Sequence, residues 1–175
     1  MPLLQDGGID LTFKKFIDGL DSVVKWTAIA MFSIMTVAIV LQVIFRYILH
    51  ASLSWSEELA RYLFVWSVLL GSAMCVKRRS HVGVEVFTMY LPKNLQRYSI
   101  FLADILGLIF YGILIIYGFN VVKITMNQFS ASLGIKMGYP YLSIPVAGIV
   151  MFLNGLYNML EDLKQFKEND GVVRA

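Results

Sequence analysis

The sequence predicts an all-α integral membrane protein, and three observations support that prediction. Of its 175 residues, 58% are hydrophobic and 15% are charged, and the mean hydropathy is +0.68. Soluble domains hold about 45–50% apolar and about 25% charged residues. Apolar stretches long enough to cross a hydrocarbon core of about 30 Å recur along the chain, with charged residues gathered between them. We therefore expect a single membrane domain over residues 1–175, with four transmembrane helices, an N-terminal amphipathic helix and an interfacial helix between spans two and three.

The chain is expected to begin with an amphipathic helix over residues 10–25, followed by a first span over about 26–46. Apolar residues in the first segment recur at roughly helical spacing, with charged residues between them. Such a helix should lie in the membrane interface and run into the span. No small-residue cleavage site follows the span, so we expect it to be a retained anchor.

The second span, expected at about 57–77, carries charges at both of its ends. Ser54 and Glu57 have capping-box spacing, which predicts that the helix begins at about Trp55. Residues 62–76 are uncharged, and a basic cluster follows them directly: Lys77, Arg78 and Arg79. An apolar run that ends in a basic cluster is typical of a span that stops at the cytoplasmic surface.

The third and fourth spans are expected at about 99–123 and 140–160. The connection from Ser80 to Gln96 is too short to cross the membrane, so we expect a short helix on its surface, although its alternating valines would also suit a strand. Glycines in the third span would permit close helix packing; they are Gly107, Gly112 and Gly118. Pro140 and Pro145 open the fourth span, and residues 164–175 should form a loose cytoplasmic tail.

The distribution of lysine and arginine predicts the orientation of the chain. The N-terminal segment, the middle connection and the tail hold eleven of these residues, against four on the other side of the predicted membrane. Cytoplasmic segments carry the excess of such residues. Both termini are therefore expected in the cytoplasm. The net charge of +3 follows from these segments and does not indicate a nucleic-acid partner.

Three charges and a tryptophan near the start of the second span are the first candidate site. Glu57, Glu58 and Arg61 should share one helical face, because they lie three and four residues apart. One interpretation is an ion pair at the helix end, and the other is contact with a partner or a periplasmic binding protein, since an arginine at the membrane boundary usually needs a partner. Trp66 lies deeper and is expected to pack against protein, which makes it a further candidate for partner contact.

The remaining polar candidates lie toward the other side. The basic cluster and the pair His81 and Glu85 are expected at the interface or at lipid headgroups. Asp104 is the candidate for a buried charge. A metal site would need more ligands than the two histidines and their neighbours supply, and the sequence shows no nucleophile–base arrangement or phosphate loop. We therefore expect no enzyme activity, no metal and no cofactor.

The residues of the second span resemble a known family. Residues 55–73 have the sequence WSEELARYLFVWSVLLGSA, and residues 81–85 have the sequence HVGVE. These sequences resemble the small membrane subunit of tripartite ATP-independent periplasmic (TRAP) transporters, the DctQ-like family. The family pattern has an acidic pair, an arginine, a tryptophan, a glycine and then a histidine with a following acid. The pattern falls on Glu57, Glu58, Arg61, Trp66, Gly71 and His81. The last acid is commonly aspartate in the family, and here it is Glu85. The four spans, the VIFRY sequence over residues 43–47 and the proline that opens the fourth span extend the resemblance to nearly the whole chain.

The resemblance implies an accessory role in the bacterial inner membrane. In this family the small subunit forms a heterodimer with a large multi-span permease subunit, which carries the sodium and substrate sites. A periplasmic binding protein delivers an organic acid, such as a C4-dicarboxylate or a sialic acid, and transport is sodium-coupled and uses no ATP. The large subunit is expected to work by an elevator motion, and the small subunit would widen and fix its scaffold. The expected partners are thus the large subunit, the binding protein and membrane lipids, with sialic acid as the preferred substrate.

Two other functions stay open at this point. A haem-bearing or structural membrane anchor of a respiratory complex would need axial ligands, usually histidines within the spans. His50 and His81 lie outside the predicted spans. A self-sufficient small transporter would need charges or broken helices near the middle of the membrane, and the predicted spans offer neither.

Overall fold

The computed structural model describes residues 8–51, 53–78 and 93–173, and most of this part of the chain is helical. Its elements are α1 (Gly8–Tyr47), α2 (Ser54–Lys77), α4 (Lys93–Thr125), α5 (Gly138–Tyr141) and α6 (Ser143–Val173). Four segments are long and apolar enough to cross a membrane: Thr12–Tyr47, Ser54–Lys77, Phe101–Thr125 and Gly138–Leu163. The predicted all-α membrane fold with four spans is confirmed. The predicted interfacial helix between spans two and three lies outside the described residues.

The helix boundaries refine the sequence prediction at three places. The amphipathic segment and the first span form one continuous helix, α1. The capping-box prediction is wrong, because the N-cap residue of α2 is Leu53 and no side chain caps the helix. Ser54 is already helical, and it is Ser56 that donates a hydrogen bond from its hydroxyl to the Leu53 carbonyl at 2.7 Å. α6 stays helical as far as Val173, so the predicted tail of residues 164–175 continues the last span as helix up to that residue.

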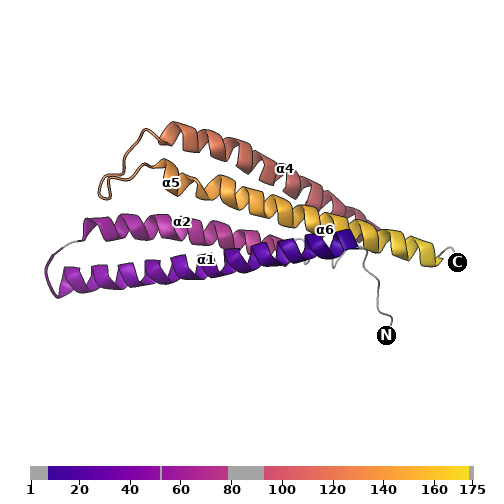
Figure 1. The fold of residues 1–175 in the computed structure, drawn as a ribbon, viewed down its shortest axis with the longest axis horizontal. Coiled ribbons are helices and arrows are strands. Elements are labelled where there is room, and N and C mark those ends of the chain that lie inside the picture. The colour runs from indigo at the N-terminus through magenta and orange to yellow at the C-terminus, as the bar shows by residue number, and fades with distance from the viewer. Residues whose placement is uncertain (1–7, 52, 79–92, 174–175) are drawn as a thin grey trace.

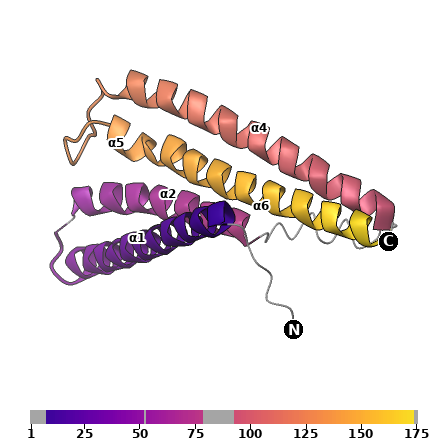
Figure 2. The same cartoon turned by 45° about the vertical axis from the view of Figure 1, so that its right-hand side comes forward.

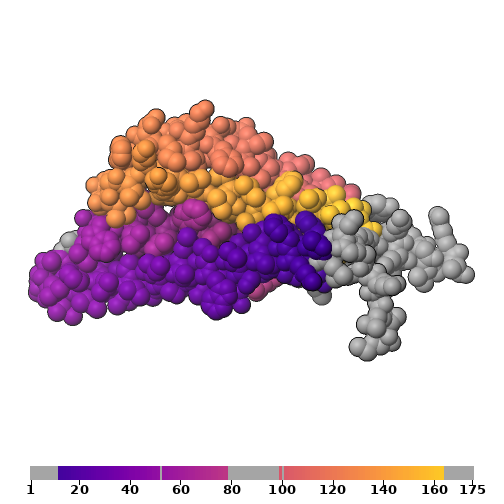
Figure 3. All heavy atoms as spheres, in the orientation of Figure 1, coloured from indigo at the N-terminus to yellow at the C-terminus, as the bar shows by residue number. Residues whose placement is uncertain are grey.

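The long helices lie side by side in a row, in the order α1, α2, α6, α4 (Figures 1 and 2). α2 packs on α1 and α6, and α6 packs on α2 and α4, so these two helices have neighbours on both sides. The side chains of α1 and α4 form the two opposite edges of the row (Figure 3). The first two spans are thus neighbours in the row, and α2 and α6 are exposed only on the two broad faces of the row.

The core lies mainly along α6, where this helix packs against α2 on one side and α4 on the other. α6 is the most enclosed of the four spans, with 44% of its most apolar window buried, against 11% for α1. The buried hydrophobic cluster draws on all four long helices and consists of Val24, Leu70, Ala73, Val76, Tyr111, Ala147, Val150 and Met151. Small residues such as Ala73 and Ala147 allow the helix backbones to approach closely, which is how helices associate when lipid is as apolar as protein.

α4 and α6 approach each other closely at Gly118. A Cβ atom on this residue would lie 2.9 Å from Cδ of Pro145, closer than real Cβ contacts. At Gly112, by contrast, no described atom lies within 4 Å of the position that a Cβ would take. The prediction that glycines of the third span permit close packing is therefore confirmed for Gly118, whereas no described part of the chain packs against Gly112.

The row has two distinct ends, the Lys77 end and the Glu58 end, each called after a residue of α2 that lies there. The Lys77 end holds the start of α1, the last turn of α2 and the second half of α6. The Glu58 end holds the start of α2, the end of α4, α5 and the loop of residues 126–137, called the α4–α5 loop. The helices converge at the Lys77 end and spread apart toward the Glu58 end in both views (Figures 1 and 2).

Candidate functional site

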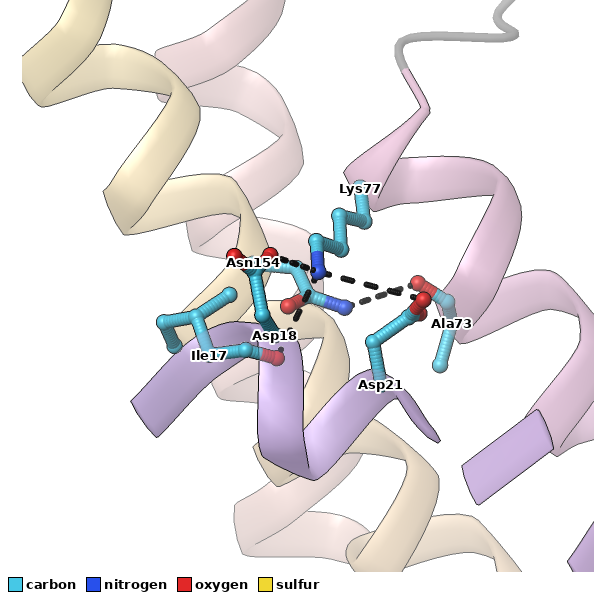
Figure 4. Close-up of polar contacts among 6 residues, drawn as sticks. All are labelled: Ile17, Asp18, Asp21, Ala73, Lys77 and Asn154. Atoms are coloured by element: carbon cyan, nitrogen blue, oxygen red, sulfur yellow. Dashed lines mark hydrogen bonds and ion pairs between the residues drawn. The ribbon is translucent and has the colours of Figure 1, made fainter. Parts of the chain in front are cut away.

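Lys77 links α2 to the start of α1. Its ammonium nitrogen lies 2.7 Å from Oδ1 of Asp18, 3.8 Å from Oδ2 of Asp21 and 3.4 Å from the carbonyl oxygen of Ile17 (Figure 4). The side chains of Lys77 and Asp21 are only 16% and 17% exposed, whereas Asp18 is 56% exposed. The ammonium donates hydrogen bonds to Asp18 and to the Ile17 carbonyl, and it forms a longer ion pair with Asp21. We call this group the Lys77 site.

Two asparagines of α6 bind α2 in the same region. The side-chain amide of Asn154 donates to the Ala73 carbonyl at 3.0 Å, and that of Asn158 donates to the Val76 carbonyl at 2.8 Å (Figure 4 shows the first). Both asparagines are buried. Hydrogen bonds of this kind join helices where apolar contacts alone discriminate little against lipid. The last turn of α2 is thus held by α1 on one side and by α6 on the other.

Glu58 makes the corresponding link at the opposite end of α2. Its Oε2 accepts hydrogen bonds from the backbone N–H groups of Ser132 at 2.9 Å and Leu133 at 3.0 Å. Its Oε1 accepts a short hydrogen bond from the hydroxyl of Tyr62, one turn further along α2. The Tyr62 oxygen also lies 3.1 Å from the sulfur of Met137. A carboxylate with backbone donors makes charge-assisted bonds, which are stronger than neutral ones. We call this group the Glu58 site.

The α4–α5 loop has a defined shape that presents these donors. The N–H of Ser130 donates to the Ile135 carbonyl at 2.8 Å, and the N–H of Met137 donates to the Gln128 carbonyl at 2.9 Å. Gly134 has a φ of 64°, a left-handed conformation that glycine adopts without steric cost, and it allows the loop to turn back on itself. The loop tip therefore points two successive N–H groups at Glu58.

The three charges predicted to share one face are divided in the structure. Arg61 pairs with Glu57 at 3.2 Å, and both side chains are exposed, at 67% and 65%. Glu58 turns toward the α4–α5 loop instead. An exposed pair four residues apart on a helix contributes about 0.3–0.5 kcal/mol to stability. Contact of Glu57 and Arg61 with another protein stays a prediction, whereas Glu58 has partners within the chain.

The other predicted residues fall in separate places. Trp66 is partly buried and packs against the core cluster. Asp104 lies on α4, half-buried, with its Oδ2 fully covered. Arg78 follows directly after α2 and is exposed. The remaining candidates, Arg79, His81 and Glu85, lie outside the described residues. Neither Trp66 nor Asp104 is among the residues that form the Lys77 site or the Glu58 site.

Comparison with known proteins decides the family. Residues 35–165 match the sequence model described as "Tripartite ATP-independent periplasmic transporters, DctQ component". The chain belongs to the DctQ family. As a member of this family it is a component of a TRAP transporter, and the transporter interpretation takes the place of the haem-bearing anchor.

Three relatives of this DctQ chain illustrate the range of the family. The sialic acid TRAP transporter small permease protein SiaQ of Vibrio cholerae is 26% identical over 151 residues, which is 86% of each chain. The C4-dicarboxylate TRAP transporter small permease protein DctQ of Rhodobacter capsulatus is 34% identical over 102 residues, 57% of this chain and 45% of that one. The sialic acid TRAP transporter permease protein SiaT of Haemophilus influenzae is 26% identical over 137 residues, 78% of this chain but 22% of that protein.

Four residues that hold this DctQ chain together were not singled out from its sequence: Asp18, Asp21, Asn154 and Asn158. The two asparagines lie four residues apart within an apolar span, so they share a face, and polar residues inside a span usually have partners. The spacing of the two asparagines within an apolar stretch is therefore a signal in the sequence that predicts contact with another helix. The two aspartates resemble the other charges of the amphipathic segment, and only the position of α2 distinguishes them.

The Glu58 site of this DctQ chain leads to a prediction about the α4–α5 loop. Glu58→Gln replaces an acceptor-only carboxylate with a neutral amide, so at least one of the present bonds is lost or weakened. We expect the backbone amides of Ser132 and Leu133 to exchange their hydrogen roughly tenfold faster, as measured by hydrogen–deuterium exchange and mass spectrometry.

Glu57→Gln is the matched control for Glu58→Gln. It makes the same chemical change one residue earlier, at a side chain that pairs only with Arg61 among the described residues. Exchange in the α4–α5 loop should stay unchanged in this variant. Equal acceleration in the two variants would show that the loop does not depend on Glu58.

Proposed function

We propose that this chain is the small permease subunit of a sodium-coupled TRAP transporter and that its row of helices packs against the large permease subunit as part of a fixed scaffold. The observation that carries the proposal is the row itself. A closed bundle hides the inner face of every span, but the row leaves α1 and α4 packed on one side only. The Lys77 site and the Glu58 site hold the row at its two ends. A row of helices that is fixed in this way is suited to widening a larger membrane protein.

The surface of the row supports this proposal. Large apolar side chains are exposed along α1 and α4, among them Phe32, Val37, Ile109, Ile113 and Ile116. Within a membrane these side chains meet either lipid or another membrane protein. The relative SiaT supports the second possibility for part of the surface, because this chain matches only 22% of that longer permease protein. We infer that the rest of such a protein corresponds to a separate large subunit here.

The finer parts of the proposal concern substrate, orientation and docking. We propose an organic acid as substrate, with sialic acid favoured over C4-dicarboxylates because the relatives named for sialic acid match 86% and 78% of this chain and the Rhodobacter capsulatus relative matches 57%. We place the Lys77 end in the cytoplasm, since Lys77 and Arg78 of the basic cluster lie there. The Glu58 end would then face the periplasm of a bacterial inner membrane, where the substrate-binding protein docks.

The experiment that tests the proposal is co-purification from the native membrane. The chain is tagged, extracted in mild detergent and isolated, and the proteins that accompany it are identified by mass spectrometry. A large multi-span permease present in equal amount is the expected result. A chain that is isolated alone, or only with further copies of itself, would contradict the proposal.

Arg61 provides a sharper test of contact at the Glu58 end. Because its ion pair with Glu57 is exposed, Arg61→Ala should leave the stability of the isolated chain nearly unchanged. If Arg61 contacts another subunit, the variant should recover several-fold less large permease in the same co-purification, while membrane insertion stays normal.

Arg46→Ala is the control, because it removes an exposed arginine at the same end of the row, on α1. Equal recovery of the large permease with the unmodified chain, Arg61→Ala and Arg46→Ala would show that Arg61 only stabilises its own helix.

A further inference from the structure

A groove of about 460 Å³ runs along one side of the contact between α1 and α2. From α1 it is lined by Lys25, Ile29, Phe32 and Ser33, which follow one another along one helical stripe. Met74 of α2 and the adjacent Arg78 are among the residues that line it from the other side. The volume is in the range of small-molecule binding sites in proteins.

The groove changes from charged to apolar along its length. Lys25 directly precedes Trp26, where the uncharged stretch of α1 begins, and Arg78 follows the uncharged stretch of α2 by two residues. Both cations therefore lie at the same boundary of the apolar layer, at the Lys77 end. Trp26 is exposed beside them, which is typical of a side chain at a membrane interface. Further into the row the walls are formed by Ile29, Phe32 and Met74.

We propose that this groove binds one anionic phospholipid of the leaflet at the Lys77 end. Its phosphate lies between Lys25 and Arg78, and one acyl chain lies along Ile29, Phe32 and Met74. Charge complementarity selects this occupant, because the described lining residues include two cations and no carboxylate. The nearest carboxylate on α1, that of Asp21, faces Lys77 at 3.8 Å. Basic pockets between membrane helices bind anionic headgroups in this way.

A lipid in this position supports the least buried span of the row. α1 packs mainly on α2, and only 11% of its most apolar window is buried within the chain. The bound acyl chain adds contacts to both helices next to the Lys77 site. This proposal does not depend on the large permease subunit, since every residue that it uses belongs to this chain.

Native mass spectrometry tests the proposal directly. The tagged chain, with whatever subunits accompany it, is placed in vesicles of equal parts phosphatidylglycerol and phosphatidylcholine and then extracted in mild detergent. We expect one phospholipid to remain bound to this chain, with phosphatidylglycerol favoured several-fold over phosphatidylcholine. Lys25→Gln should lower the retained phosphatidylglycerol about fivefold, since one basic residue near a membrane surface contributes a factor of this size.

Two further variants separate the headgroup from the acyl chain. Lys15→Gln removes an exposed lysine of the same helix outside the groove and should leave lipid retention unchanged. Ser33→Trp fills the apolar part of the groove and should lower the retention of both phospholipids. Equal retention of the two phospholipids by the unmodified chain, or equal retention by Lys25→Gln and Lys15→Gln, would overturn the proposal.

The alternative occupant is a helix of the large permease. Ser33→Cys, made together with Cys75→Ser to remove the native exposed cysteine, places a single thiol in the groove for a photoactivated cross-linker. Cross-linking to phospholipid supports the proposal. Cross-linking to the large permease would show that protein covers the groove and would overturn it.

Discussion

Lys77→Met is expected to lower the free energy of unfolding by about 2–3 kcal/mol and to detach the start of α1 from α2. Removing one partner of a fully buried ion pair costs roughly 3–5 kcal/mol, because the other charge is left buried without compensation. Here Asp21 is left in that state, with its side chain 17% exposed, while Asp18 at 56% reaches water, which makes the expected loss smaller. The measurement is unfolding by sodium dodecyl sulfate in mixed micelles, followed by tryptophan fluorescence, to which Trp66 contributes from its position against the core.

A second substitution separates loss of charge balance from loss of packing. In the double variant Lys77→Met with Asp21→Asn, the uncompensated carboxylate is absent, so we expect at least part of the stability to be recovered. The loss of unfolding free energy in the double variant should therefore be smaller than the sum of the losses in the two single variants. Lys15→Met is the control for removal of an exposed lysine from the same end and should change stability little. Equal destabilisation by Lys77→Met and Lys15→Met would show that the Lys77 site does not hold α1.

The spans could be predicted from the sequence because the membrane imposes a simple requirement, a run of apolar residues of sufficient length. The lateral order of the spans could not. Leu70 is 4% exposed within the chain and Phe64 is 52% exposed, yet both are large apolar residues of the same helix. Since a lipid-facing and a protein-facing side chain are equally apolar, hydropathy does not indicate that α6 lies between α2 and α4.

The polar sites show the same limit in another form. Spacing along one helix predicts pairs such as Glu57 with Arg61, and that pair is present. It cannot predict that Glu58 binds backbone groups 74 and 75 residues away, or that Lys77 binds Asp18 across 59 residues. These contacts depend on the packing of the row. The sequence therefore indicated that both ends of α2 carry polar chemistry, but not which residues complete it.

Gly118→Ala is expected to destabilise the contact of α4 with α6 by about 1–3 kcal/mol, the usual cost of an added group in a well-packed interior. The new methyl group would lie 2.9 Å from Cδ and 3.0 Å from the backbone nitrogen of Pro145. Both atoms belong to the proline ring, which cannot rotate away as a flexible side chain would. The backbones of the two helices must therefore move apart, and the same detergent titration should show the loss.

Gly112→Ala makes the identical chemical change on the same helix and isolates the steric effect. No described atom lies within 4 Å of the added methyl group, so the gain in helix propensity, at most about 1 kcal/mol, is its main effect. Stability should then stay unchanged or rise slightly. Because the propensity gain is shared by both variants, the difference between them measures the clash with Pro145. Equal stability of Gly118→Ala and Gly112→Ala would mean that α4 and α6 tolerate a wider separation and that the row does not depend on their close approach at Gly118.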